Sequence, residues 1–314
     1  MHAHPDAITD PARTPPKVAL PAVHCLACAL LRPRHQPVRP QLFRMEQLGL
    51  PPSFLDTVAD HAAHLPWDLY DVARRRREVL RRHASILAPA QRALLQDDDA
   101  DPCMVWNTLQ DALPSVLRAA LLRIQPHRRR AMRKYVAWRA SEACWRLQPL
   151  DDTGFEQPGG AARAPRRVFA PIVPALTYHP DMLRLVAGIA ETIHQRCDAT
   201  RLQLVVHQMM TVAHGQAAAE PAPEGLHQDG ADYVVSALVI RRQGVRGGVS
   251  RVRHGNAGPL LLEQTLGVGD GLFHPDAGSP LWHEVSALHA AHPDQPGHRL
   301  ILGIDAHVLP EHSP

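Results

Sequence analysis

Apolar residues recur at two different spacings along this chain, and the change separates a helical part from a strand-rich part. Between Pro51 and Pro126 they stand three or four residues apart, in segments such as "SFLDTVADHAAHL", "WDLYDVARRRREVLRRHASIL" and "CMVWNTLQDALPSVLRAALLRI". This spacing puts them on one face of a helix. Over residues 135–147, "YVAWRASEACWRL", the period is ambiguous and favours a strand.

The second half of the chain is dominated by short segments with the pattern of strands. A helix is predicted first, over residues 181–197, because apolar residues at helical spacing follow Pro180. Beyond it come "RLQLVVHQMMTVA", "LHQDGADYVVSALVI", "GGVSRVRHG", "GPLLLEQTL", "GDGLFHP", "SPLWHEVSAL" and "HRLILGIDAHVL", with turn residues between them. Strands at such regular spacing predict an antiparallel sandwich or barrel. We expect an α+β fold in which helices buttress this β core.

Three parts of the chain are expected from these patterns. Residues 1–40 hold a large share of the 30 prolines and show no lasting periodicity, which predicts an irregular arm. Residues 41–134 are expected to form a helical region packed on the core. Residues 135–314 are expected to form the β core itself.

Composition excludes several classes of protein. Lys and Arg number 34 against 31 Asp and Glu, so the formal charge of +3 gives no sign of a nucleic-acid partner. Two basic clusters, residues 74–77 and 127–134, are interpreted as solvated helix faces, with polyanion binding as the alternative. Five scattered cysteines indicate a reducing compartment. No segment has the pattern of a membrane span or a cleaved leader, so we expect a cytoplasmic protein without a membrane partner.

One histidine and one aspartate stand two residues apart at the start of a predicted strand. In "EGLHQDGADYVVSALVI", His227 and Asp229 would point to the same side of an extended chain and could bind one metal ion. The chain has 21 histidines, so the H-x-D pattern alone has little weight. Four other copies contain proline, which favours turns and helix starts, and they begin at His4, His179, His274 and His292. Context therefore favours the copy at His227.

A further histidine and an arginine lie on later predicted strands. His283, in "SPLWHEVSAL", is the best candidate for a third ligand, since His254, His274, His292 and His298 fall at expected turns or loops. Two histidines and one carboxylate can occupy one face of Fe(II) and leave positions for a chelating cosubstrate and O₂. Arg299, in "GHRLILGID", could pair with a carboxylate of that cosubstrate through its planar fork. An arginine facing solvent on an edge strand is the alternative.

Longer segments around these residues resemble a known family. "PEGLHQDGADYVVSALVIRRQGVRGGVS", "GVGDGLF", "LWHEV" and "GHRLILGI" are similar to bacterial Fe(II)/2-oxoglutarate dioxygenases that hydroxylate free L-amino acids, of which the isoleucine 4-hydroxylase group is one branch. The resemblance covers roughly residues 165–308. It implies a double-stranded β-helix, or jelly roll, with Fe(II) bound by His227, Asp229 and His283 and 2-oxoglutarate by Arg299. The implied reaction uses O₂, hydroxylates an unactivated C–H bond, and releases succinate and CO₂.

Two carboxylates beside the motif are candidates for binding a substrate ammonium. Glu224 precedes it and Asp232 follows it, and a bend near Gly230 would be needed to turn Asp232 inward. A solvated carboxylate is the alternative for Asp232. Two other classes of protein compete with a small-molecule hydroxylase: a metal-binding jelly roll of cupin type, non-catalytic or using another metal, and a helical protein whose arginines bind a polyanion. The sequence does not predict the substrate or the oligomeric state.

Overall fold

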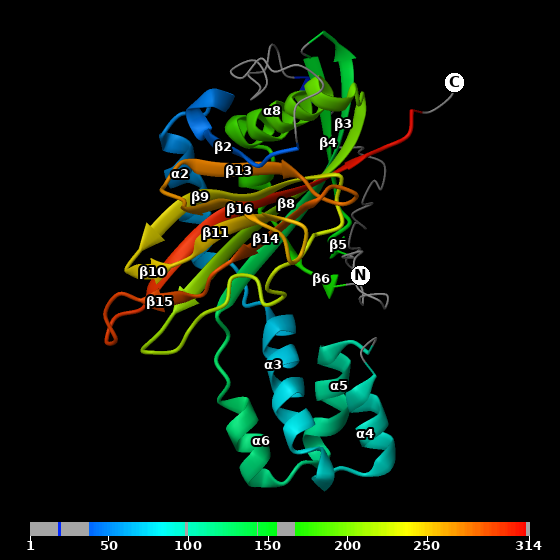
Figure 1. Cartoon of the computed structure of the whole chain (residues 1–314), viewed down its shortest axis with the longest axis vertical. Helices are drawn as coiled ribbons and strands as arrows, with labels where there is room; N and C mark the ends of the chain where they lie inside the picture. Colours follow the sequence, from blue (N-terminus) through cyan, green and yellow to red (C-terminus); the bar gives the residue numbers. More distant parts are fainter. Residues whose placement is uncertain (1–17, 20–37, 98–99, 143, 156–166, 312–314) are drawn as a thin grey trace, which may run out of the picture.

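The structure is a computed structural model that describes residues 18–19, 38–97, 100–142, 144–155 and 167–311. It has the predicted α+β architecture, with an antiparallel β core and flanking helices (Figure 1). Most of the expected arm, residues 1–40, lies outside the described residues. Within that range, β1 (Val18–Ala19) pairs with β4 (Cys144–Leu150) at the edge of the main sheet. No helix in the described ranges combines the length and the apolar character that crossing a membrane requires.

The main sheet collects strands from distant parts of the sequence. Its strands lie in the order β1, β4, β3 (Arg128–Ser141), β8 (Arg201–Ala213), β16 (Gly297–Val308), β9 (Tyr233–Gln243), β13 (Asp270–Pro275) and β2 (Gln41–Arg44). Each neighbouring pair is antiparallel. The short strand β7 (Ala170–Pro171) pairs in parallel with β3.

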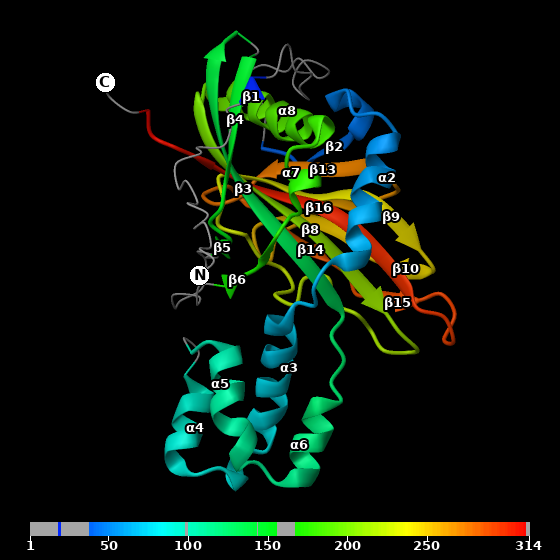
Figure 2. The same cartoon turned by 180° about the vertical axis from the view of Figure 1, so that it is seen from behind.

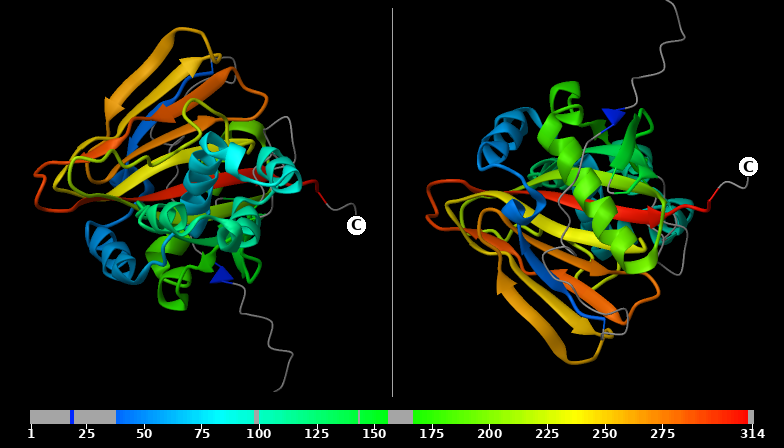
Figure 3. Two further views of the ribbon diagram at one scale, coloured as in Figure 1. Left: turned by 90° about the horizontal axis from the view of Figure 1, so that it is seen from below. Right: turned by 90° about the horizontal axis from the view of Figure 1, so that it is seen from above.

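A smaller sheet covers one face of the main sheet. It contains β12 (Leu260–Thr265), β11 (Val249–His254) and β14 (Leu281–Val285), drawn in yellow and orange in Figure 3. Two strand pairs complete the β structure: β10 (Val245–Gly247) with β15 (Leu288–Ala290), and β5 (Gly154–Phe155) with β6 (Arg167–Val168). The two packed sheets form the jelly-roll core that the sequence predicts.

Strand alternation gives the main sheet two different faces. On β16, Leu300, Leu302 and Ile304 belong to the main apolar core, together with buried residues of α8 (Pro180–Cys197) and α2 (Ser53–Asp60). The residues between them face the smaller sheet, because successive side chains of a strand point to opposite sides. Arg299 and Asp305 are on this second face. One strand therefore contributes to the core on one side and to a cavity on the other.

The helix α8 begins as predicted. His179 precedes it and its Nδ1 accepts a hydrogen bond from the backbone N–H of Asp181, while Pro180 occupies the first helical position. The short helix α7 (Pro174–Thr177) lies just before it. This copy of "HPD" is a helix start.

The remaining helices form a separate lobe. The helices α3 (Leu69–Arg82), α4 (Pro89–Gln96), α5 (Pro102–Leu109) and α6 (Ser115–Leu122) pack around an apolar cluster of their own, below the β core in Figures 1 and 2. Short 3₁₀ segments lie at η1 (Met45–Leu48), η2 (His61–His64), η3 (Ala84–Ile86) and η4 (Gln110–Ala112). The structure differs here from the expected single helical region packed on the core, because only α2 and its neighbours contribute to the main core.

The first basic cluster is only partly a solvated helix face. Arg77 on α3 is buried and donates to the carbonyl oxygens of Leu95 and Ala100, both at 3.1 Å. The guanidinium of Arg76 stacks on the ring of Trp106, 4.4 Å from its centroid. These arginines satisfy carbonyls and cover apolar surface between helices. The interpretation as a solvated face fails for Arg76 and Arg77, because a run of like charges does not show which of its members point inward.

The second basic cluster lies on a strand. β3 begins at Arg128, so the expected boundary between residues 134 and 135 falls inside this strand. Arg128, Arg130 and Arg133 are 5%, 9% and 7% exposed, respectively. The prediction of a helix face is wrong here, because the alternation of a strand puts Arg128 and Arg130 together on the cavity side.

Candidate metal centre and cavity

Two candidate metal ligands are joined through their backbones. His227 lies in the segment that leads into β9, and His283 lies on β14. The N–H of His227 donates to the carbonyl of His283 at 2.9 Å, and the N–H of His283 donates back at 3.0 Å. The centroids of the two imidazole rings are 4.5 Å apart. His283 therefore lies on a strand that returns beside His227, as a shared metal ion would require.

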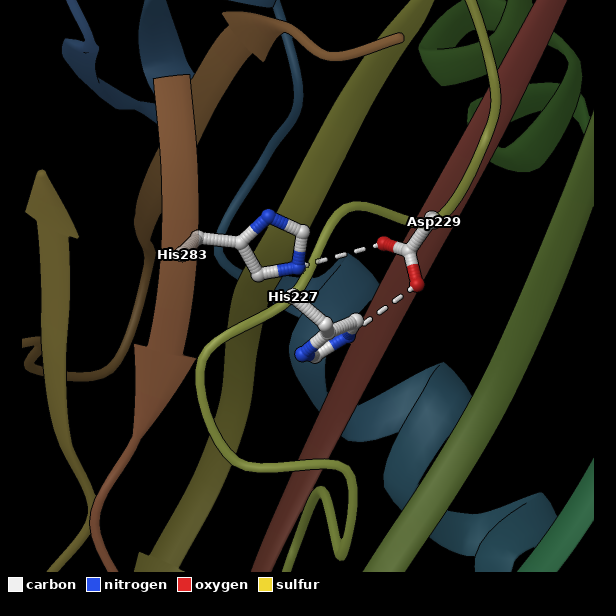
Figure 4. A group of neighbouring side chains, drawn as sticks. All are labelled: His227, Asp229 and His283. Carbon is white, nitrogen blue, oxygen red and sulfur yellow. Dashed lines mark ion pairs between the residues drawn. The ribbon is translucent and has the colours of Figure 1, made fainter. Parts of the chain in front are cut away.

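The carboxylate of Asp229 lies beside the two rings and contacts one nitrogen of each. Its Oδ1 is 3.3 Å from Nε2 of His227, and its Oδ2 is 3.2 Å from Nε2 of His283 (Figure 4). The three ligand atoms lie within 4.8 Å of one another. Neighbouring ligands of an octahedral ion with bonds of about 2.1 Å stand roughly 3 Å apart. The donor set therefore fits one ion held on a single face by two imidazoles and a carboxylate.

A hydrogen bond favours the ligand tautomer of His227 and nearby charges favour the ionised carboxylate of Asp229, whereas His283 is held in its protonated state. A carbonyl oxygen can only accept, so Nδ1 of His227 donates to Gly225 at 2.8 Å and Nε2 keeps its lone pair. Burial alone would raise the pKa of Asp229, but His283 and His227 hold it well below its usual range. Burial alone would lower the pKa of His283, but the carboxylates of Asp229 and Asp276 raise it to about 10. A bound cation would replace this attraction and release protons.

A second polar layer lies behind His283. His274 and Asp276 are fully buried at the end of β13, and Oδ1 of Asp276 is 3.6 Å from Nδ1 of His283. Oδ2 of Asp276 accepts from the backbone N–H of Gly230 at 2.8 Å. Sequence reasoning interpreted this "HPD" as a turn and missed its position. The available signal was its place directly after a strongly apolar strand, "GDGLFHP".

The candidate ligands open into a cavity between the two sheets. Its volume is about 840 Å³, including the part that is open to solvent. Apolar side chains cover part of its wall: Phe155, Met209, Val235, Leu272 and Ile301. Charged side chains line the rest, including Arg128, Arg130, Arg167, Glu224, Arg299 and Asp305.

Arg299 faces this cavity as an uncompensated cation. It is 3% exposed, and its Nε and Nη2 have no hydrogen-bond partner among the described residues. Burial and the nearby Arg242 lower the pKa of its guanidinium to about 10. The hairpin before β11 packs closely against it: a Cβ at Gly248, where φ is +67°, would lie 2.7 Å from a methyl of Leu288 and 3.5 Å from Cδ of Arg299.

The two candidate substrate carboxylates have different surroundings. Glu224 lines the cavity, with Oε1 at 3.9 Å from Nη1 of Arg167. Asp232 is exposed and accepts from the backbone N–H of Val308 at 2.7 Å. Gly230 does bend the chain, with φ at +87°, but the bend leaves Asp232 outside the cavity. Asp232 is therefore dropped as a candidate for substrate binding.

Sequence reasoning also missed a polar group on the opposite wall. His207 on β8 lies between Arg130 on β3 and Asp305 on β16. Asp305 has the same parity along β16 as Arg299, which was the one signal available from the sequence. The pairing of three strands that brings these side chains together had no local signature.

Comparisons with known proteins agree with this geometry. The family model described as "2OG-Fe dioxygenase" matches residues 121–305. A solved structure of a bsmA homolog from Methylobium petroleophilum PM1 is 20% identical, with a TM-score of 0.63 over 92% of this chain and 96% of that one. The Fe(II)/(alpha)ketoglutarate-dependent dioxygenase TqaL is 13% identical, with a TM-score of 0.50 over 86% of this chain and 82% of that one. A search of curated proteins found no match.

At these identities the structural similarity shows the fold alone, and the family model covers more than half of the chain. Membership of this family agrees with the His-Asp-His donor set and with the cavity that opens beside it. The chain belongs to the 2OG-Fe dioxygenase family and is an enzyme that uses Fe(II), 2-oxoglutarate and O₂.

Proposed function

We propose that this enzyme hydroxylates an unactivated C–H bond of a free L-amino acid, or of a related small amine acid, and releases succinate and CO₂. The observation that carries the proposal is that the unpartnered guanidinium of Arg299 opens into the same cavity as His227, Asp229 and His283. The three ligands can bind a metal ion, and the guanidinium can bind a carboxylate in the same cavity.

Each of these side chains has a defined task in the proposal. His227, Asp229 and His283 hold Fe(II) through two Nε2 atoms and one carboxylate. Bound Fe(II) and 2-oxoglutarate supply the oxidising chemistry that O₂ makes available. Arg299 binds the distal carboxylate of 2-oxoglutarate, because a guanidinium can donate two parallel hydrogen bonds to it. Burial of an unpaired guanidinium is costly, and the incoming carboxylate compensates that charge.

The rest of the cavity favours a small substrate with both apolar and charged parts. Met209, Leu272 and Ile301 offer apolar contact and keep water from the region around the candidate ligands. Charges of both signs line the same space, among them Arg167 and Glu224. This mixture suits an aliphatic amino acid better than a purely apolar molecule.

The two competing interpretations lose their support. A non-catalytic jelly roll of cupin type leaves the buried Arg299 without a partner, and the family assignment decides against it. A polyanion site on the second basic cluster needs exposed arginines, whereas Arg128 and Arg130 are buried.

The test is an assay of the purified enzyme with Fe(II), 2-oxoglutarate and O₂ against the common and several non-proteinogenic L-amino acids. We expect at least one amino acid to gain the mass of one oxygen, with succinate formed in step. Both signals should vanish when iron is withheld. If no amino acid is oxidised, and a substrate of another class is, the proposed function is wrong.

A further inference from the structure

The polar group on the wall formed by β3, β8 and β16 is built around one imidazole. Nη2 of Arg130 lies 3.0 Å from Nδ1 of His207, and Oδ2 of Asp305 lies 3.1 Å from Nε2 of the same ring. All three side chains line the cavity and are at most 9% exposed. A cation and an anion therefore stand on opposite sides of a single histidine.

The hydrogen bonds define the state of that histidine. A guanidinium can only donate, so Nδ1 of His207 accepts from Arg130 and Nε2 carries the ring's hydrogen. Nε2 then donates to the carboxylate of Asp305. Burial and the charge of Arg130 both lower the pKa of His207, which keeps the ring neutral. A neutral spacer holds the two charges apart and prevents them from pairing directly.

Neither the guanidinium of Arg130 nor the carboxylate of Asp305 forms an ion pair with an oppositely charged group in the described part of the protein. No carboxylate there lies within 4.0 Å of the guanidinium of Arg130, whose Nε has no hydrogen-bond partner and which stacks 4.3 Å from the ring centroid of Phe169. Asp305 has the imidazole of His207 as its one basic neighbour at that range among the described residues. Arg128, in contrast, is paired with Asp68 at 2.9 Å. Burying unmatched charges is unfavourable unless a ligand compensates them.

Space is left beside this group. Gly303 faces His207 in the register of β16 and β8 and lines the cavity. A Cβ at Gly303 would lie 3.3 Å from Cε of Met209 and 3.9 Å from Cβ of His207. Any side chain at this position would project into the space next to the ring, so the glycine keeps that space open.

We propose that Arg130, His207 and Asp305 form the subsite for the head group of an α-amino acid, with the substrate's carboxylate bound to Arg130 and its ammonium to Asp305. The two charged groups of an α-amino acid share one carbon, so they match two opposite charges that are separated by one imidazole and its hydrogen bonds. This inference rests on the proposed function and narrows it to substrates whose α-amino and α-carboxyl groups are both free. Simple amines, simple carboxylic acids and residues within a peptide are excluded.

The first test needs no variant. The amino acid that gives the most product in the panel is compared with its deaminated acid, its decarboxylated amine and its N-acetyl derivative, by calorimetric binding and by product formation. We expect each analogue to bind at least about 10-fold more weakly, because each leaves one buried charge unmatched. An analogue that binds as tightly as the amino acid overturns the inference.

The second test assigns each charge to its residue. Asp305→Asn should raise the Kd of the amino acid at least about 10-fold. It should also reduce the ratio by which the amino acid binds more tightly than the deaminated acid. Arg130→Met should instead reduce the ratio by which the amino acid binds more tightly than the decarboxylated amine. Arg130→Lys should restore part of that ratio. Asp232→Asn and Arg129→Met are controls outside the cavity and should leave the ratios between the analogues as they are in the parent.

A purely structural role would have a different signature. It would lower the melting temperature and weaken 2-oxoglutarate and amino-acid binding together, with the ratios between analogues unchanged. That result overturns the inference and leaves the proposed function standing. If the parent enzyme oxidises no amino acid and does oxidise a substrate of another class, the proposed function itself has failed, so the two failures are distinguishable.

Discussion

His227 and His283 exchange two backbone hydrogen bonds, of 2.9 and 3.0 Å. This one-residue bridge adds His227 to the edge of the smaller sheet beside β14. Their imidazoles are therefore placed by the backbone as well as by side-chain packing. A metal centre built on paired extended segments is more rigid than one built on a free loop. Asp229 follows two residues later, before the chain enters β9.

Removing any candidate ligand should remove iron binding. We expect His227→Ala, Asp229→Ala and His283→Ala each to abolish iron-dependent succinate formation and to lower iron affinity by roughly 100-fold or more. Metal analysis after desalting measures the second effect without turnover. His179→Ala is the control: it removes the N-cap of α8 and should cost about 1 kcal/mol of stability while iron binding is retained. Retained iron and activity in His283→Ala would show that the third ligand is misassigned.

Asp276 should orient His283. Histidines that bind metals usually donate their second ring N–H to a carboxylate, and Asp276 is the carboxylate beside Nδ1 of His283. Asp276→Asn should lower iron affinity by about 10- to 100-fold with little change in the fold. The exposed "HPD" at residues 292–294 gives a matched control, and Asp294→Asn should have no effect. Equal iron affinity in both variants would contradict this role.

Arg299 should determine the affinity for 2-oxoglutarate. Arg299→Ala should weaken binding by about 2–5 kcal/mol, because the distal carboxylate would enter a desolvated cavity without a partner. Arg299→Lys should recover part of the loss, since it keeps the charge and lacks the planar fork. Anaerobic titration of the Fe(II) enzyme, followed by its charge-transfer absorbance, measures this directly. If Arg299→Ala binds 2-oxoglutarate like the parent, another cation holds it, and Arg242 is the nearest candidate.

Glu191 should make the stability depend on pH in the acid range. Burial would raise the pKa of this carboxyl, but hydrogen bonds from Gln195 and Trp145 and the charge of Arg139 lower it below 4.5. A carboxyl with a depressed folded-state pKa stabilises the fold above its unfolded pKa, and the contribution is lost as pH falls. Urea unfolding of Glu191→Gln should show a deficit at pH 7 that narrows below about pH 4.5. Glu78→Gln, on an exposed position of α3, should show no such change, and a constant deficit in Glu191→Gln would refute the prediction.

Arg77 should stabilise the helical lobe without affecting the metal centre. Arg77→Met keeps the apolar stem and removes the guanidinium that donates to Leu95 and Ala100. We expect a loss of about 2–3 kcal/mol, because buried carbonyls lose charge-assisted hydrogen bonds. Hydrogen exchange should locate faster opening in α3 to α5, with iron affinity unchanged. Arg82→Met, at the exposed end of α3, is the control, and equal exchange in the two variants would argue against the role.

The sequence predicted the parts of this molecule that rest on local signals. The strand over "HRLILGIDAHVL" and the helix after His179 follow from spacing and capping within a few residues. The proximity of His283 to His227 followed because a metal requires a third ligand from a returning strand, and the structure brings the two together.

The parts that could not be predicted depend on contacts between distant strands. Arg130 sits in a run of basic residues whose composition suggests a solvated surface, and only the pairing of β3 with β8 puts it beside His207. Asp276 shares its "HPD" sequence with three copies in other settings, so its burial behind His283 was invisible in the motif. Long-range pairing, rather than local propensity, decides both positions.

Strand β16 carries Arg299 and Asp305 on the same face, six positions apart. An extended chain advances about 3.3 Å per residue, so the two side chains emerge roughly 20 Å from each other. Hydrogen bonds to β8 on one side and β9 on the other prevent this separation from changing. In the proposed arrangement β16 holds the cosubstrate through Arg299 and the substrate's ammonium through Asp305, so regioselectivity becomes a matter of counting bonds from the α-carbon. A substrate whose side chain is longer by one methylene at its far end should then be oxidised at the same number of bonds from the α-carbon, whatever the relative strengths of its C–H bonds.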